Sequence, residues 1–217
     1  MDIAKLIDHT FLGAAGDEGA VRKLCREAKR YGFASVCVNP AEVELAVRLL
    51  KNSAVKVCTV IGFPLGQNTA NVKCAEALQA LDDGAEELDV VINQRLLRYD
   101  PFACYYDLQP LVEEVRERKR KTVLKLILEC CNLTDAEIKT GCKIAMRLGF
   151  DFVKTSTGFG KGGATVKDVE LMRRCVGRKL GIKAAGGIRT LADAKAMIAA
   201  GATRLGCSAG VAIVKGS

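Results

Sequence analysis

Eight short apolar segments alternate with longer amphipathic segments along this chain, and this alternation restricts the fold more than any other feature of the sequence. A repeated strand–helix–strand order implies a parallel sheet with its helices packed on the faces. Eight such units are the number that closes a sheet, so we expect one domain, residues 1–217, folded as an α/β protein of the (β/α)8 TIM-barrel class. An open, doubly wound sheet is the structural alternative, but no GxGxxG fingerprint supports it.

The spacing of the apolar residues predicts where the elements lie. The expected strands are Leu6–His9, Ser35–Asn39, Lys56–Phe63, Glu87–Asn93, Val123–Glu129, Phe152–Thr157, Gly181–Gly186 and Arg204–Ser208. The expected helices are Glu18–Gly32, Ala41–Lys51, Ala70–Gly84, Phe102–Lys119, Asp135–Leu148, Val166–Val176 and Leu191–Ala200. Thr134 and Glu137 have the spacing of a capping box, and Thr165 and Thr190 are expected N-caps.

The composition indicates a folded cytoplasmic protein. Its 217 residues are 49% hydrophobic, which argues against disorder, yet no apolar run is long enough to span a membrane. The N-terminal segment lacks the layout of a signal peptide. The ten cysteines are scattered without a CxxC pair, which favours free thiols in a reducing compartment. With one histidine and no CxxC pair, we expect no metal site.

The net charge of +8 is compatible with a nucleic-acid partner or with an anionic substrate. The densest basic run, Arg116–Lys121, would make nucleic-acid binding steeply dependent on salt. However, Glu117 interrupts this run, and the chain has no Trp to serve as a stacking platform. We therefore interpret the run as a solvated helix end and expect neither a nucleic-acid nor a membrane partner.

Charged residues interrupt four consecutive apolar strands. In the fifth strand, alternation turns the leucines toward the helices and Lys125 toward the barrel interior. The same alternation places Asp89, Lys154 and Lys183 on the inner faces of the fourth, sixth and seventh strands. Neighbouring strands lie about 4.8 Å apart, so Lys154 and Lys183 are expected to sense each other's charge.

A buried lysine beside another cation suits Schiff-base chemistry. A lysine attacks a carbonyl only when neutral, and burial with a neighbouring cation can lower its pKa from about 10.4 to roughly 7–8. The resulting iminium withdraws electrons when an adjacent carbon–carbon bond breaks. One lysine at a strand end is more often a solvated side chain. Three lysines with one aspartate on successive strands favour a metal-free aldolase.

Two glycine-rich loops occupy the positions where barrels of this class commonly bind phosphate. They follow the seventh and eighth strands and read "AAGGIRT" (Ala184–Thr190) and "GCSAG" (Gly206–Gly210). Glycines let backbone N–H groups approach an anion. Together with the excess positive charge, the loops predict a phosphorylated ligand.

Eight stretches of the sequence occur in the order typical of one known family: "LIDHTFL", "VCVNP", "VIGFPLG", "ELDVVIN", "LKLILE", "DFVKTSTGFG", "KAAGGIRT" and "LGCSAG". By these stretches, nearly the whole chain resembles the deoxyribose-phosphate aldolases. The resemblance implies a class I aldehyde-lyase, without metal or cofactor, in deoxyribose phosphate catabolism. Its reaction is the reversible cleavage of 2-deoxy-D-ribose 5-phosphate to D-glyceraldehyde 3-phosphate and acetaldehyde. Another phosphate-binding Schiff-base aldolase barrel is the alternative.

The resemblance also implies roles for individual residues. Lys154 matches the Schiff-base lysine, Lys183 the second lysine that lowers the pKa of the first and relays protons, and Asp89 the aspartate that works with a water. The matching substrate-binding positions are Thr10, Cys37, Lys125, Thr155, Gly158, Gly186, Gly187, Arg189, Gly206 and Ser208. A homodimer or homotetramer is ordinary for such a family.

Overall fold

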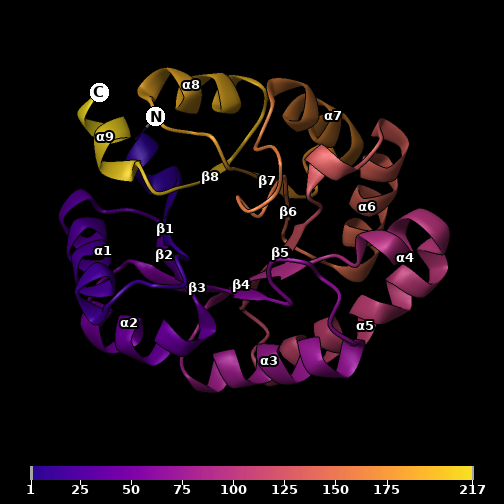
Figure 1. The fold of residues 1–217 in the computed structure, drawn as a ribbon, viewed down its shortest axis with the longest axis horizontal. Helices are drawn as coiled ribbons and strands as arrows, with labels where there is room; N and C mark the ends of the chain where they lie inside the picture. Colours follow the sequence, from indigo (N-terminus) through magenta and orange to yellow (C-terminus); the bar gives the residue numbers. More distant parts are fainter. Residues whose placement is uncertain (1, 217) are drawn as a thin grey trace.

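The eight strands close into a single parallel barrel surrounded by helices (Figure 1). The structure, a computed structural model, describes residues 2–216. Strand β1 (Ile7–Phe11) pairs in parallel with both β2 (Ser35–Val38) and β8 (Arg204–Cys207), so the sheet has no open edge. The predicted (β/α)8 barrel is therefore confirmed, and the open sheet is excluded.

Strands and helices alternate along the chain, with two α-helices in succession between the fourth and fifth strands. The strands are β1 Ile7–Phe11, β2 Ser35–Val38, β3 Lys56–Ile61, β4 Glu87–Val91, β5 Val123–Ile127, β6 Phe152–Lys154, β7 Gly181–Ala185 and β8 Arg204–Cys207. The α-helices are α1 Glu18–Tyr31, α2 Val43–Leu50, α3 Ala70–Asp82, α4 Gln94–Tyr99, α5 Pro101–Arg118, α6 Asp135–Leu148, α7 Val166–Val176, α8 Leu191–Ala199 and α9 Gly210–Lys215. Within the described residues, short 3-10 helices span Ile3–Leu6, Pro40–Glu42 and Cys130–Asn132.

The side-chain caps explain where several elements begin. Helices α6 and α7 span the predicted residues, and Thr134, Thr165 and Thr190 accept hydrogen bonds from the backbone as N-caps. Helix α4 was not predicted. Asn93, which was expected to end the fourth strand, instead caps α4 by accepting a hydrogen bond from the Leu96 N–H. Such caps satisfy N–H groups that have no partner within the helix.

The sixth strand is shorter than predicted and ends at Lys154 rather than Thr157. The Thr157 N–H and hydroxyl donate to the Glu129 carboxylate, so this part of the chain leaves the sheet. Glu129 itself has a left-handed backbone, with φ of 59°, which ends the fifth strand at Ile127. The Glu129–Thr157 contact therefore shapes the mouth of the barrel.

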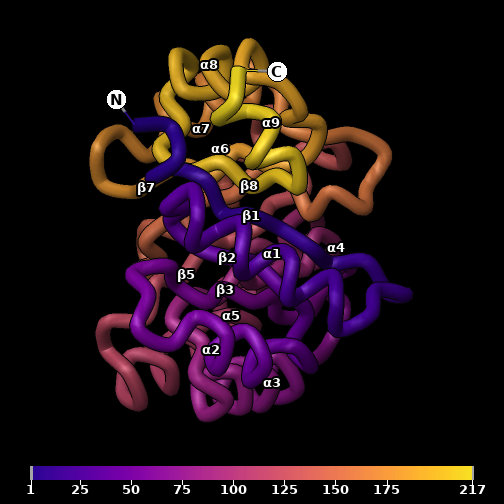
Figure 2. Tube along the Cα trace, turned by 90° about the vertical axis from the view of Figure 1, so that its left-hand side faces the viewer, coloured from indigo at the N-terminus to yellow at the C-terminus, as the bar shows by residue number. Residues whose placement is uncertain are grey.

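The main apolar core lies between the strands and the helices. Leu124 and Leu126 are fully buried in it, and Lys125 between them faces the barrel interior, as the alternation predicts. The chain's first and last described residues lie on the same side of the molecule, close to α8 and α9 (Figure 2). Within residues 2–216, no helix combines the length and the apolar character needed to cross a membrane.

Candidate active site

Asp89 stands at the centre of a buried group of lysines in the barrel. The Lys154 and Lys183 ammoniums both lie 2.7 Å from Asp89 Oδ2, and the Lys125 ammonium lies 2.8 Å from Oδ1. Asp89, Lys125 and Lys183 are fully buried, and Lys154 is 3% exposed. The strand register explains why these four side chains lie together. Asp89 of β4 pairs with Lys125 of β5, and Lys154 of β6 pairs with Lys183 of β7.

A second set of charges, which the sequence analysis did not single out, continues this network below Asp89. Asp8 Oδ2 lies 2.5 Å from the Lys183 ammonium, and Glu87 Oε2 lies 2.6 Å from the Lys125 ammonium. Arg204 contacts both carboxylates, at 2.6 Å from Asp8 and 3.1 Å from Glu87. The period of two already indicates Glu87, since it shares the inner face of β4 with Asp89.

The network sets the charge state of its members. Burial favours the protonated form of Asp89, but the attraction of Lys125, Lys154 and Lys183 outweighs it and holds the pKa of Asp89 well below its usual range. Burial opposes charge on Lys183, but Asp8 and Asp89 outweigh it and raise the pKa of Lys183. Burial likewise opposes charge on Lys125, yet its carboxylate neighbours raise the pKa of Lys125 well above the usual value. Lys183 and Lys125 are therefore held as cations.

These shifts predict how stability depends on pH. The folded state depresses the pKa of Asp89 and of Asp8, so their contribution is complete above about pH 4 and is lost as the pH falls further. It raises the pKa of Lys125 and Lys183, so their contribution is complete below about pH 10 and is lost as the pH rises. The free energy of unfolding, measured in urea as a function of pH, should therefore decline at both acid and alkaline pH. Asp8→Asn should make the acid decline shallower, and an unchanged acid decline would contradict the assignment.

The interior also holds two groups whose spacing suits a metal ion: Cys37, Cys58 and Asp89, and Asp8, Cys58 and Glu87. The chemistry of these donors does not suit a resident cation. Each of the three carboxylates already contacts a lysine or arginine within 3 Å, so a metal would have to displace or repel those cations. We assign no metal to this site.

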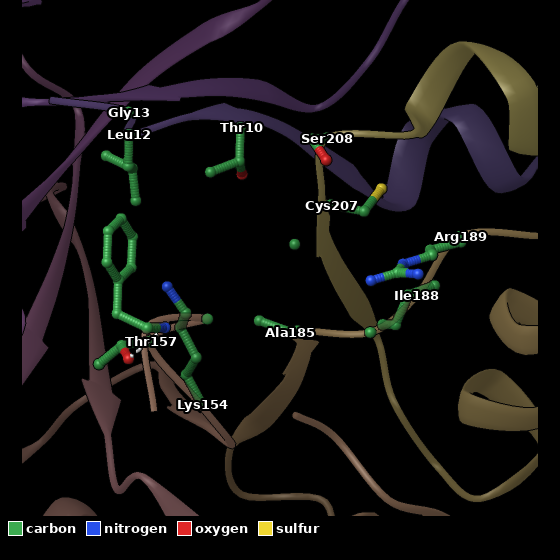
Figure 3. A pocket seen from close by; sticks show the side chains of 15 residues that line it. Thr10, Leu12, Gly13, Lys154, Thr157, Ala185, Ile188, Arg189, Cys207 and Ser208 are labelled. Carbon is green, nitrogen blue, oxygen red and sulfur yellow. Dashed lines mark hydrogen bonds between the residues drawn. The ribbon is translucent and has the colours of Figure 1, made fainter. Parts of the chain in front are cut away.

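A cavity of about 270 Å³ opens above the network at the mouth of the barrel. The Lys154 ammonium points into it, with Leu12 and Thr157 on one side and Ile188 and Arg189 on the other (Figure 3). Of the residues proposed from the sequence, those that line the cavity are Thr10, Lys154, Gly158, Gly186, Gly187, Arg189, Gly206 and Ser208. The structure thus brings together loops that follow β1, β6, β7 and β8.

Three proposed substrate-binding residues do not line this cavity. Cys37 is fully buried and packs with Leu12 and Cys58 in a small apolar cluster inside the barrel. The Thr155 hydroxyl is bound within the sheet, donating to the Ala185 carbonyl and accepting from the Ala185 N–H. Lys125 is fully buried, with its ammonium 2.8 Å from Asp89 Oδ1. Their side chains lie beneath the cavity rather than in its lining. The period of two along a strand predicts which face a side chain is on, but it does not predict how deep the cavity extends.

The loop after β7 has the backbone that close approach requires. Gly186 and Gly187 have φ of 84° and 80°, a region that disfavours side chains. Gly163 packs so closely on this loop that a Cβ at this position would collide with the Gly186 carbonyl oxygen. The Ala164 N–H donates to both the Ala185 and Gly186 carbonyls. These contacts fix the backbone of Gly186 and Gly187 beside Arg189, and we call these two residues the glycine rim.

Comparison with known proteins identifies the class. The family model described as DeoC/LacD family aldolase matches residues 3–216. The chain therefore belongs to the DeoC/LacD family of aldolases.

Its similarity to particular proteins is also close. A deoxyribose-phosphate aldolase of Thermoanaerobacter sp. (strain X514) is 53% identical over 218 residues, covering 99% of this chain and 96% of that protein. One from Halalkalibacterium halodurans is 53% identical over 216 residues, covering 99% and 95%. The tetrameric deoxyribose phosphate aldolase structure from Aeropyrum pernix superposes with a TM-score of 0.92 at 36% identity, covering 98% of this chain and 89% of that one.

Proposed function

We propose that this aldolase is a deoxyribose-phosphate aldolase that uses Lys154 as its Schiff-base nucleophile. One observation carries the assignment of the nucleophile. Of the three lysines that contact Asp89, Lys154 alone lines the cavity, whereas Lys125 and Lys183 are fully buried. A substrate carbonyl can therefore reach Lys154 and not the other two.

In the cleavage direction, the Lys154 amine adds to the C1 aldehyde of the open-chain sugar phosphate, and loss of water gives an iminium. Removal of the C3 hydroxyl proton then breaks the C2–C3 bond. The electron pair enters the enamine, and C3 leaves as the aldehyde of glyceraldehyde 3-phosphate. Protonation of C2 and hydrolysis release acetaldehyde and free Lys154. Asp89, in contact with Lys154 and Lys183, supports the proton transfers together with a water.

Reductive trapping tests this proposal. Acetaldehyde with borohydride should add one ethyl group to Lys154 and inactivate the enzyme, which peptide mass spectrometry would locate. The chain has many other lysines, so modification confined to exposed ones would contradict the proposal. A panel of phosphorylated and unphosphorylated aldehydes would then separate this reaction from that of another Schiff-base aldolase.

The phosphate is proposed to bind on the opposite side of the cavity from Leu12, at the glycine rim, Ser208 and Arg189. Arg189→Met should raise KM for 2-deoxyribose 5-phosphate about fivefold, the effect of about 1 kcal/mol from one solvent-screened cation. The kcat/KM for unphosphorylated 2-deoxyribose should not change. An equal loss with both substrates would show that Arg189 does not act on the phosphate.

The assembly and location are proposed on similar grounds. The Aeropyrum pernix relative is described as a tetramer, which supports a homo-oligomer here. The ten cysteines are free thiols in the structure, which supports a reducing, cytoplasmic location.

A further inference from the structure

Phe159 lies between two cavities at the mouth of the barrel. It lines the catalytic cavity together with Lys154, and it also lines a second cavity of about 220 Å³. Thr157, in the same loop after β6, also lines both cavities. The second cavity is otherwise lined by Gly160 of that loop and by the segments that follow β3, β4 and β5. A residue shared in this way is a partition between the two spaces.

The partition is held firmly on both sides. The Phe159 N–H donates to the Thr157 hydroxyl at 3.0 Å, and that hydroxyl donates to the Glu129 carboxylate. The next residue, Gly160, is packed so tightly that a Cβ there would lie 3.0 Å from the Glu129 carboxyl carbon. The Phe159 ring stands edge-on to Phe63, with ring centroids 5.2 Å apart. Phe159 therefore keeps its place although 57% of it is exposed.

The geometry of the proposed reaction indicates which donor substrates the Phe159 partition would exclude. This argument rests on the proposed function. The nucleophilic carbon of the enamine must face the acceptor aldehyde, whose phosphate is proposed to bind on the Arg189 side of the cavity. The other substituent of the imine carbon must then point toward the opposite side, where Leu12 and Thr157 lie. In an aldehyde donor this substituent is a hydrogen atom, and in a ketone donor it is a carbon group.

We propose that Phe159 is a specificity-determining residue that restricts the donor to small aldehydes by closing off the second cavity. That cavity is lined by amides and a carboxylate, from Gln67, Gln94, Asn132 and Glu129. These groups suit the hydroxyl of a hydroxymethyl ketone better than an alkyl chain. Removing the Phe159 ring would join the two spaces and give such a donor a polar subsite.

The test compares donors in the wild type, Phe159→Ala and Phe159→Leu, with glyceraldehyde 3-phosphate as acceptor. Acetaldehyde is compared with hydroxyacetone and with butanone, which has a methyl group in place of the hydroxyl. For Phe159→Ala, the ratio of kcat/KM for hydroxyacetone to that for acetaldehyde should rise at least about tenfold, and butanone should gain less. Phe159→Leu should stay close to the wild type. Phe102→Ala removes another exposed phenylalanine, from α5, and should change no ratio.

Borohydride trapping gives a second readout that needs no turnover. Hydroxyacetone should label Lys154 of Phe159→Ala more than Lys154 of the wild type. Unchanged donor ratios together with equal labelling would overturn the inference. If acetaldehyde failed to label the wild type at Lys154, the proposed function would fall and this inference with it. If acetaldehyde labels Lys154 of the wild type but Phe159→Ala changes neither the donor ratios nor the labelling by hydroxyacetone, only this inference is overturned.

Discussion

Lys154→Met should abolish carbon–carbon cleavage, with kcat/KM falling at least about 10⁴-fold, as expected when a covalent nucleophile is removed. The physical reason is that the thioether of methionine cannot form an imine, and the remaining lysines beside Asp89 lie outside the cavity. Cleavage is measured by coupling the release of glyceraldehyde 3-phosphate to its oxidation. Borohydride with acetaldehyde should leave the variant unlabelled.

The fold of Lys154→Met should survive. The network holds the cations Lys125, Lys154, Lys183 and Arg204 against the carboxylates Asp8, Glu87 and Asp89, so losing one cation balances its charges. Removing one partner of a buried ion pair destabilises a protein because it leaves a charge uncompensated, but Asp89 keeps Lys125 and Lys183 as partners when Lys154 is replaced. Lys161→Met, in the exposed loop after β6, is the matched control and should keep its activity. Labelling or turnover in Lys154→Met would place the nucleophile elsewhere.

Asp89→Asn should damage both stability and activity. The carboxylate accepts contacts from three ammoniums, and a neutral amide leaves these buried cations under-compensated. Breaking a buried ion pair by removing one partner costs about 3–5 kcal/mol, and here the loss falls on three contacts at once. We expect the free energy of unfolding, measured in urea, to drop by about this amount. Because we propose that Asp89 supports the proton transfers, its replacement should also lower kcat at least about 100-fold.

The control for this prediction is Asp135→Asn. Asp135 lies 2.9 Å from the Lys167 ammonium, but that pair is on the surface, with side chains 53% and 72% exposed. Because solvent screens an ion pair on the surface, this variant should unfold nearly as the wild type does. If Asp89→Asn were as stable as the wild type, the buried network would not be charged as described.

Much of the fold follows from local pattern. Helices α6 and α7 begin at threonine caps and keep their predicted bounds, since a cap depends on residues within one turn. The ends of β5 and β6 could not be predicted in the same way. They depend on Glu129 and Thr157, which lie 28 residues apart in the chain and meet only when neighbouring strands pair. The missed helix α4 likewise depends on whether Asn93 continues a strand or caps a helix.

The inner faces of the strands were determined by the sequence itself, because side chains alternate with a period of two whatever the rest of the fold does. That rule already directs Asp89, Lys125, Lys154 and Lys183 inward. The tertiary structure decided the depth of each group and its partners. Closure of the barrel brings Asp8 of β1 against Lys183 of β7, and the loop after β6 leaves only Lys154 of these lysines open to the cavity. Such contacts join distant parts of the chain, and therefore strand register and barrel closure, rather than local spacing, decide which lysine can react.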